Sequence, residues 1–153
     1  MTTATAPSAG PLAFFTADHR ACDELWAAVE AAVDRDDRAA AHAAFARFDA
    51  ATRRHLDMEE QVLFPAFEQA TGMTMGPTQV MRHEHAQMRG LLDQMARAAD
   101  RDLDAMVEYG DTLLMLTQQH NLKEEGVLYP MTEANLADAW APIAARLTTY
   151  LAP

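Results

Sequence analysis

Apolar residues recur along most of the chain at alternating spacings of three and four, which places them on one face of an α-helix. The first such stretch follows Pro11, a residue favoured in the first turn of a helix. Its stripe consists of Phe15, His19, Cys22, Trp26, Val29 and Val33. No stretch of useful length shows the period of two that a half-buried strand requires. The pattern therefore predicts an all-α protein.

The same rhythm defines three further long helices, separated by short breaks. The breaks are residues 34–37, which carry charged capping residues, and residues 71–78, which read TGMTMGPT. We expect Pro65 to distort or stop the second helix near its end and the fourth helix to end near Pro130, because proline lacks the backbone donor that a helix interior needs. The stripe of the second helix consists of Phe45, Phe48, Thr52, His55, Glu59, Val62 and Ala66. That of the third helix consists of Met81, His85, Met88, Leu92 and Met95. That of the fourth helix consists of Met106, Tyr109, Leu113, Leu116, His120, Glu124 and Val127.

Helices of this length joined by short breaks predict an antiparallel up-down-up-down four-helix bundle over about residues 11–130. A shorter C-terminal helix is expected over about residues 135–151, and residues 1–10 are expected to form a flexible N-terminal tail. With 153 residues, the chain is long enough for one packed core. Residues 11–151 are therefore predicted to be a single domain.

Every helix of the predicted bundle carries a histidine inside its apolar stripe, and two helices add a glutamate four residues later. Four residues turn a helix by about 40° and advance it by about 6 Å, so each of these pairs shares one face. The residues concerned are His19, His55, Glu59, His85, His120 and Glu124. An unpaired buried carboxylate costs several kcal/mol, so something positive must lie between the two glutamates.

Two protein cations lie close enough in sequence to supply that charge. Lys123 adjoins Glu124 and therefore points elsewhere on the helix, which leaves Arg89, one turn after His85, as the serious candidate. Imidazole and carboxylate groups together are typical ligands of borderline metal ions. Two metal ions are the better explanation of the pattern.

The candidate ligands belong to an internal repeat. Residues 55–65 read HLDMEEQVLFP and residues 120–130 read HNLKEEGVLYP. Upstream of each lies an acid-histidine pair, at residues 18–19 and 84–85. Such self-similarity indicates two copies of one structural unit.

In these motifs the chain resembles the hemerythrin-like domain, also called the HHE cation-binding domain, over about residues 12–130. The resemblance implies a four-helix bundle around a non-heme di-iron centre. By matching positions, the iron ligands would be His19, His55, Glu59, His85, His120 and Glu124, with the two glutamates bridging the irons. Oxygen-carrying members have a fifth histidine one turn from the third-helix ligand, and here those positions are Met81 and Arg89.

Four histidines give two per iron, and the two bridging carboxylates with a solvent-derived oxo or hydroxo bridge bring each iron to five ligands. An octahedral ion then keeps an open position, which is where chemistry takes place. We therefore expect an iron protein that binds and reacts with oxygen, peroxide or nitric oxide. The alternatives are a reversible oxygen-binding, sensing or iron-handling module without turnover, a di-iron oxidase or oxygenase acting on an organic substrate, and a structural zinc or manganese bundle. The lack of an attached output domain favours a stand-alone protein over a sensor.

Other polar residues near the ligands have less specific signals. Asp23, one turn after the first ligand histidine, could be an extra ligand or its hydrogen-bond acceptor, although an exposed aspartate is commoner. Glu60 and Glu125 lie about 140° from their histidines and are expected at the surface or behind the ligands. His83 lies about 200° from His85 on the same helix, so we assign His85 as the ligand and His83 to the surface.

Composition narrows the function further. The net charge of −11 argues against a nucleic-acid partner, which needs a basic face. No apolar run approaches the ~20 residues that cross a bilayer, and the N-terminus lacks the basic and apolar regions of a signal peptide. The single cysteine, Cys22, excludes an internal disulfide and fits a reducing cytosol. We expect a cytoplasmic monomer or weak oligomer with no membrane partner.

Overall fold

The computed structural model describes residues 9–151, which contain helices and no strand. The four long helices are α1 (Pro11–Asp34), α2 (Arg38–Met58), α4 (Pro77–Ala99) and α5 (Leu103–Lys123). The prediction of an all-α bundle built on four helices is thereby confirmed. The tail predicted for residues 1–10 falls almost entirely outside the described part. Within residues 9–151, no helix combines the length and the apolar character that a bilayer crossing requires.

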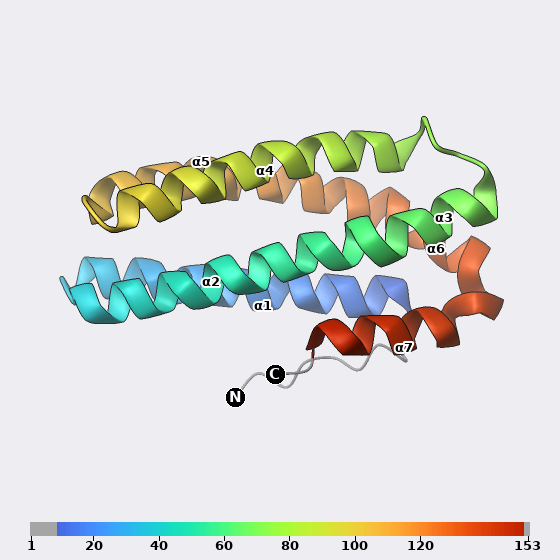
Figure 1. Cartoon of the computed structure of the whole chain (residues 1–153), viewed down its shortest axis with the longest axis horizontal. Helices are drawn as coiled ribbons and strands as arrows, with labels where there is room; N and C mark the ends of the chain where they lie inside the picture. The colour runs from blue at the N-terminus through green and yellow to red at the C-terminus, as the bar shows by residue number, and fades with distance from the viewer. Residues whose placement is uncertain (1–8, 152–153) are drawn as a thin grey trace.

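The long helices are arranged as two packed pairs. The most extensive contacts in the molecule join α1 to α2 and α4 to α5. Figure 1 shows the four helices side by side along the long axis, with the α1–α2 and α4–α5 connections at one end and the α3–α4 loop at the other. The C-terminal helix α7 (Trp140–Leu151) contacts α2 and the segment that follows it. It begins five residues later than expected, because residues up to Leu136 still belong to α6.

Both glutamate motifs interrupt their helices with a wider, π-helical turn. These turns are η2 (Glu59–Leu63) and η3 (Glu124–Leu128), after which the chain continues as α3 (Phe64–Thr71) and α6 (Tyr129–Leu136). The helix end expected near Pro130 is therefore wrong, and of the two outcomes expected at Pro65 the helix is distorted rather than stopped. Each proline lies in the first turn of the helix that resumes, where its missing backbone donor is not needed. Single π-turns of this kind occur frequently at functional sites.

Arginine side chains satisfy backbone carbonyls near the first of these prolines. The carbonyl of Glu60 accepts a hydrogen bond from Arg82, and that of Gln61 accepts one from Arg146, both at 3.3 Å. Because Pro65 cannot donate to the turn before it, these contacts supply donors that the backbone lacks there. The chain can therefore pass through the first glutamate motif without leaving that turn unsupported.

The buried apolar side chains form two clusters, one on either side of the histidine positions. One cluster lies toward α3, α6 and α7 and includes Phe15, Phe64 and Tyr129, and the other lies toward the opposite ends of the long helices and includes Trp26 and Leu92. His19 in α1 and His85 in α4 fall between residues of the two clusters, and His55 and His120 lie near the ends of α2 and α5, where the second cluster is followed by the first. The six candidate ligands are thus enclosed by apolar layers above and below.

The two halves of the repeat differ in what covers them. Val62 is fully buried, because α7 packs over η2. Val127, its counterpart in η3, was expected in the apolar stripe but is 54% exposed. That expectation is wrong because α7 covers η2, whereas η3 has no such cover in the described part of the chain.

Candidate metal centre

The structure brings together all six side chains that the sequence singles out. Each of the four long helices contributes one histidine, and each π-turn begins with one glutamate. All six are at most 5% exposed. Their ligand atoms form two groups of four, within each of which every atom lies within 4.8 Å of the others. The groups are His19, His55, Glu59 and Glu124, and Glu59, His85, His120 and Glu124. Because both glutamates belong to both groups, the two groups of ligand atoms overlap at the carboxylates.

Every imidazole turns its Nε2 atom toward a glutamate oxygen. The distances are 3.0 Å for His19 to Glu124, 3.0 Å for His55 to Glu59, 3.4 Å for His85 to Glu59 and 3.2 Å for His120 to Glu124. In addition, the Nε2 atoms of His85 and His120 lie only 3.2 Å apart. Four ring nitrogens and two carboxylates therefore converge on one small volume.

Every imidazole also binds a second carboxylate through its other nitrogen, on the outside of the cluster. The Nδ1 atoms of His19, His55, His85 and His120 lie 2.8, 2.8, 2.9 and 2.8 Å from carboxylate oxygens of Glu125, Asp18, Glu60 and Glu84, respectively. An Nδ1–H that donates to a carboxylate holds the ring in place and directs Nε2 inward, as is typical of metal-binding histidines.

These outer carboxylates follow the repeat. Asp18 and Glu84, the acids that precede the histidines of α1 and α4, bind the histidines of α2 and α5. Glu60 and Glu125, the second glutamates of the two motifs, bind the histidines of α4 and α1. The sequence pattern placed Glu60 and Glu125 outside the ligand set but assigned no role to Asp18 and Glu84. The acid-histidine pair, which occurs in both halves of the repeat, was the signal that could have identified the role of these two acids.

The protein cations considered as counter-charges lie outside this ring of carboxylates. Arg89 binds Asp57 and Glu60, and Lys123 binds Glu84. Within residues 9–151, all ion pairs of the two inner glutamates are with histidines.

Three atoms of the inner cluster are left without a hydrogen-bond partner in the described part of the chain. They are His55 Nε2, Glu59 Oε1 and Glu124 Oε2, all of them buried. The first two lie 3.0 Å apart as an ion pair but do not form a hydrogen bond. Buried polar atoms without hydrogen bonds are costly, and metal coordination would satisfy these three. Imidazole nitrogen and carboxylate oxygen are the donors that iron, zinc and manganese accept. The residues present therefore fit a metal centre.

The charges in the cluster shift its pKa values strongly. Burial alone would lower the pKa of His55, but the charges of Glu59 and Asp18 and the hydrogen bond to Asp18 together outweigh it, and the pKa is raised well above 6.5. Burial would likewise raise the pKa of Glu59, but the charge on His55 and neighbouring hydrogen bonds hold it well below 4.5. For His85, hydrogen bonds to Glu59 and Glu60 overcome the effect of burial and raise the pKa to about 9. Without metal, protons on His55 and His85 therefore help to balance the carboxylates, and metal binding must displace them.

The remaining sequence candidates lie away from the inner cluster. Asp23 is exposed and belongs to neither group of ligand atoms, and Glu125 occupies the Nδ1 atom of His19 in its place. His83 is exposed on α4, whereas His85 is 1% exposed, as the helical geometry predicts. Cys22 is partly buried, and burial raises the pKa of its thiol to about 11, so it is a poor nucleophile.

A small, largely enclosed cavity of about 30 Å³ adjoins the histidine layer. It is lined by Cys22, Asp23, Trp26, Phe48, Thr52, Gly110, Leu113, Leu114 and Thr117. Cys22 lies three residues after His19, and Thr52 and Thr117 lie three residues before the histidines of α2 and α5. The cavity is therefore about one helical turn from three of the candidate ligands.

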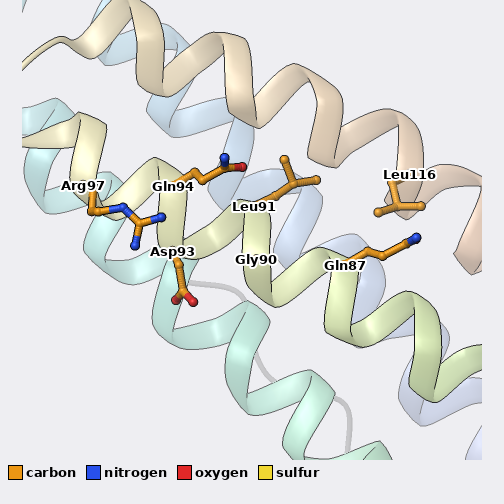
Figure 2. Close-up of a pocket in the computed structure, with 7 residues that line it drawn as sticks. All are labelled: Gln87, Gly90, Leu91, Asp93, Gln94, Arg97 and Leu116. Atoms are coloured by element: carbon orange, nitrogen blue, oxygen red, sulfur yellow. The ribbon is translucent and has the colours of Figure 1, made fainter.

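A second hollow lies along α4, where Figure 2 shows Gln87, Gly90, Leu91, Asp93, Gln94 and Arg97 of that helix together with Leu116 of α5. None of the six candidate ligands lines it. Its carboxylate, Asp93, is paired with Arg53 of α2. This hollow brings no reactive groups together, so the chemistry of the molecule centres on the buried cluster.

Comparison with known families agrees with the fold and the buried cluster. The sequence model of the hemerythrin HHE cation-binding domain matches residues 10–132. The chain belongs to this family, as its motifs predict. Searches among curated proteins and among solved structures gave no match.

Proposed function

We propose that the chain is a non-heme di-iron protein that reacts with small oxidants. The single observation that carries the proposal is the pair of overlapping ligand groups, each with two histidines and the same two glutamates. In the proposal His19, His55, Glu59, His85, His120 and Glu124 are the iron ligands, and the two glutamates bridge the ions. Two adjacent iron ions would supply two electrons together to a bound oxidant.

The surroundings of the cluster favour a small neutral reactant. Apolar layers enclose the ligands on both sides, and the cavity one turn away has a volume of about 30 Å³, which suits one water-sized or diatomic molecule. The chain's own part is to hold four imidazoles by their outer carboxylates, to exclude bulk water and to admit oxygen, peroxide or nitric oxide.

The ligand assignment is tested first by metal content. We expect elemental analysis to find two iron ions per chain, and replacement of Glu59 and Glu124 by Ala together to abolish that stoichiometry. His83→Ala is the matched control, because His83 is exposed on the same helix as His85. A double glutamate variant that still carries two irons would show that the bridging roles are wrong.

The reaction is tested by mixing the reduced, iron-loaded protein with each oxidant. We expect repeated turnover with oxygen or peroxide when a reductant is present, and a changed iron spectrum with nitric oxide. If the reduced protein instead takes up oxygen and releases it intact under vacuum over many cycles, a carrier function replaces this proposal. If it is inert to all three oxidants, a structural or iron-handling role is the better account.

A further inference from the structure

One hydroxyl group enters the inner cluster besides the six candidate ligands. Tyr129 begins α6 directly after η3 and is fully buried. Its phenol oxygen lies 2.8 Å from Glu59 Oε2, 2.9 Å from Glu124 Oε1 and 3.1 Å from His19 Nε2. All three neighbours belong to the same group of ligand atoms, the one that also contains His55.

These separations match those of donor atoms around a single octahedral ion. Nitrogen and oxygen donors lie about 2.1 Å from such an ion, so two donors on adjacent corners are about 3.0 Å apart. The tyrosine oxygen shows separations of 2.8–3.1 Å to three donors at once, and His19 Nε2 lies 3.0 Å from Glu124 Oε1. The hydroxyl of Tyr129 donates hydrogen bonds to the two carboxylates in the metal-free cluster, and its oxygen is therefore also placed where a further metal donor would lie.

The repeat supplies an internal comparison for this placement. Tyr129 in VLYP corresponds to Phe64 in VLFP. The two rings occupy equivalent places: Tyr129 lies 5.6 Å from the ring of His19 at 31°, and Phe64 lies 5.4 Å from the ring of His85 at 35°. Phe64 packs against the ring of His85 without a hydroxyl, so packing at these equivalent places requires only the aromatic ring. The oxygen of Tyr129 is the feature that packing does not explain.

We propose that Tyr129 is a seventh protein ligand, bound through its phenolate oxygen to the metal ion that His19 and His55 hold. The phenolic proton leaves to solvent when the metal binds, and one iron–oxygen bond forms. The inference rests on the proposed iron centre and makes its two positions unequal. The ion at His19 and His55 has five protein donors, whereas the ion at His85 and His120 has four and keeps more open coordination. An anionic oxygen donor also stabilises ferric iron, which favours oxidation over reversible oxygen carriage.

The test is the visible and resonance Raman spectrum of the ferric protein, because a phenolate bound to iron(III) gives a charge-transfer band and enhanced ring vibrations. We expect the band in the wild-type chain and its loss in Tyr129→Phe with the iron content unchanged. Phe64→Tyr places a hydroxyl at the equivalent position, so it should strengthen the band, and Tyr129→Phe/Phe64→Tyr should restore one.

Two further measurements keep the result decisive if Tyr129→Phe folds poorly. In a Tyr109→Phe/Tyr150→Phe chain, Tyr129 is the only tyrosine left, so the band must persist there. Ring-deuterated tyrosine in that chain should shift the Raman vibrations. A chain that binds two irons without the band, or keeps it in Tyr129→Phe, overturns the ligand role alone. A chain that binds no iron overturns the proposed function as well.

Discussion

Four outer carboxylates hold the four imidazoles, and they give individual residues of the cluster an indirect part in metal binding. Asp18, Glu60, Glu84 and Glu125 each accept a hydrogen bond from one Nδ1 atom. A carboxylate in this position orients the ring and makes Nε2 a better donor. The cluster therefore has two sets of side chains: an inner set that would bind metal, and an outer set of carboxylates that orients the inner histidines.

Removing the charge of an outer carboxylate should weaken iron binding without removing a ligand. We expect Glu125→Gln to lower iron affinity about 10–100-fold, because His19 loses its charged acceptor. Competition with a chelator measures the change. Glu108→Gln, an exposed substitution on α5, is the matched control. Equal affinities in the two variants would mean that the Glu125 contact has no influence on the metal.

The raised pKa of His85 predicts how the stability of the metal-free protein depends on pH. A histidine that binds its proton more tightly in the folded chain stabilises the fold fully below its unfolded pKa of 6.5. This contribution is lost as the pH rises through the folded pKa of about 9. We therefore expect the free energy of unfolding, measured with urea, to fall between pH 6.5 and 9. A flat profile in the metal-free wild type would contradict the proton balance.

The helices meet at a close approach between α1 and α5. A Cβ atom added to Gly110 of α5 would lie 2.1 Å from the ring of Trp26 in α1, and both residues line the cavity. Gly110→Ala must therefore displace the indole, and we expect a loss of about 1–3 kcal/mol in the free energy of unfolding. Urea unfolding of the metal-free chain at one pH measures the change.

Gly90→Ala is the matched control for this substitution. Gly90 lies inside α4, and no atom would come within 4 Å of an added Cβ there. The substitution removes backbone freedom from the unfolded chain at no steric cost, so it should raise stability by about 0.5–1 kcal/mol. The two substitutions are thus expected to change the free energy of unfolding in opposite directions. A destabilising Gly90→Ala or a neutral Gly110→Ala would show that the helix packing differs from that described.

The positions of the helices were predictable from the sequence where the periodicity of the side chains defines them. They were less predictable where backbone hydrogen bonding determines the local structure. The spacing of apolar residues gave α1 from Pro11 and the break before Arg38, as observed. The π-turns were missed, because a backbone bond from Phe64 to Glu59 depends on geometry that residue types do not specify. The exposure of Val127 was missed because only the tertiary structure shows that α7 covers one half of the repeat.

The inner cluster was predictable because residue type, face and repetition all coincide at the same six positions. Partners across helices were harder to identify, because spacing along one helix says nothing about which ring a carboxylate meets on the next. Asp18 illustrates this: it lies next to His19 in sequence but binds His55 of α2. The hydroxyl of Tyr129 is a similar case, since its three neighbours come from α1, η2 and η3.

For the whole molecule, the cluster links metal binding to stability, because its ligands come from all four long helices. A metal ion that binds only the folded chain stabilises it by about 2.7 kcal/mol at a free concentration 100 times its dissociation constant. Without metal, protons on His55 and His85 help to balance Glu59 and Glu124, and the pKa of about 9 at His85 means that this balance fails as the pH rises. We therefore expect iron to raise the melting temperature at every pH, and by more at pH 8.5 than at pH 6.

The comparison is a pair of thermal melts, iron-loaded and chelator-treated, at each pH. The Glu59→Ala/Glu124→Ala chain is the control, in which added iron should give no such gain. An iron effect that is equal at the two pH values would mean that protons and metal do not compete for the same nitrogens.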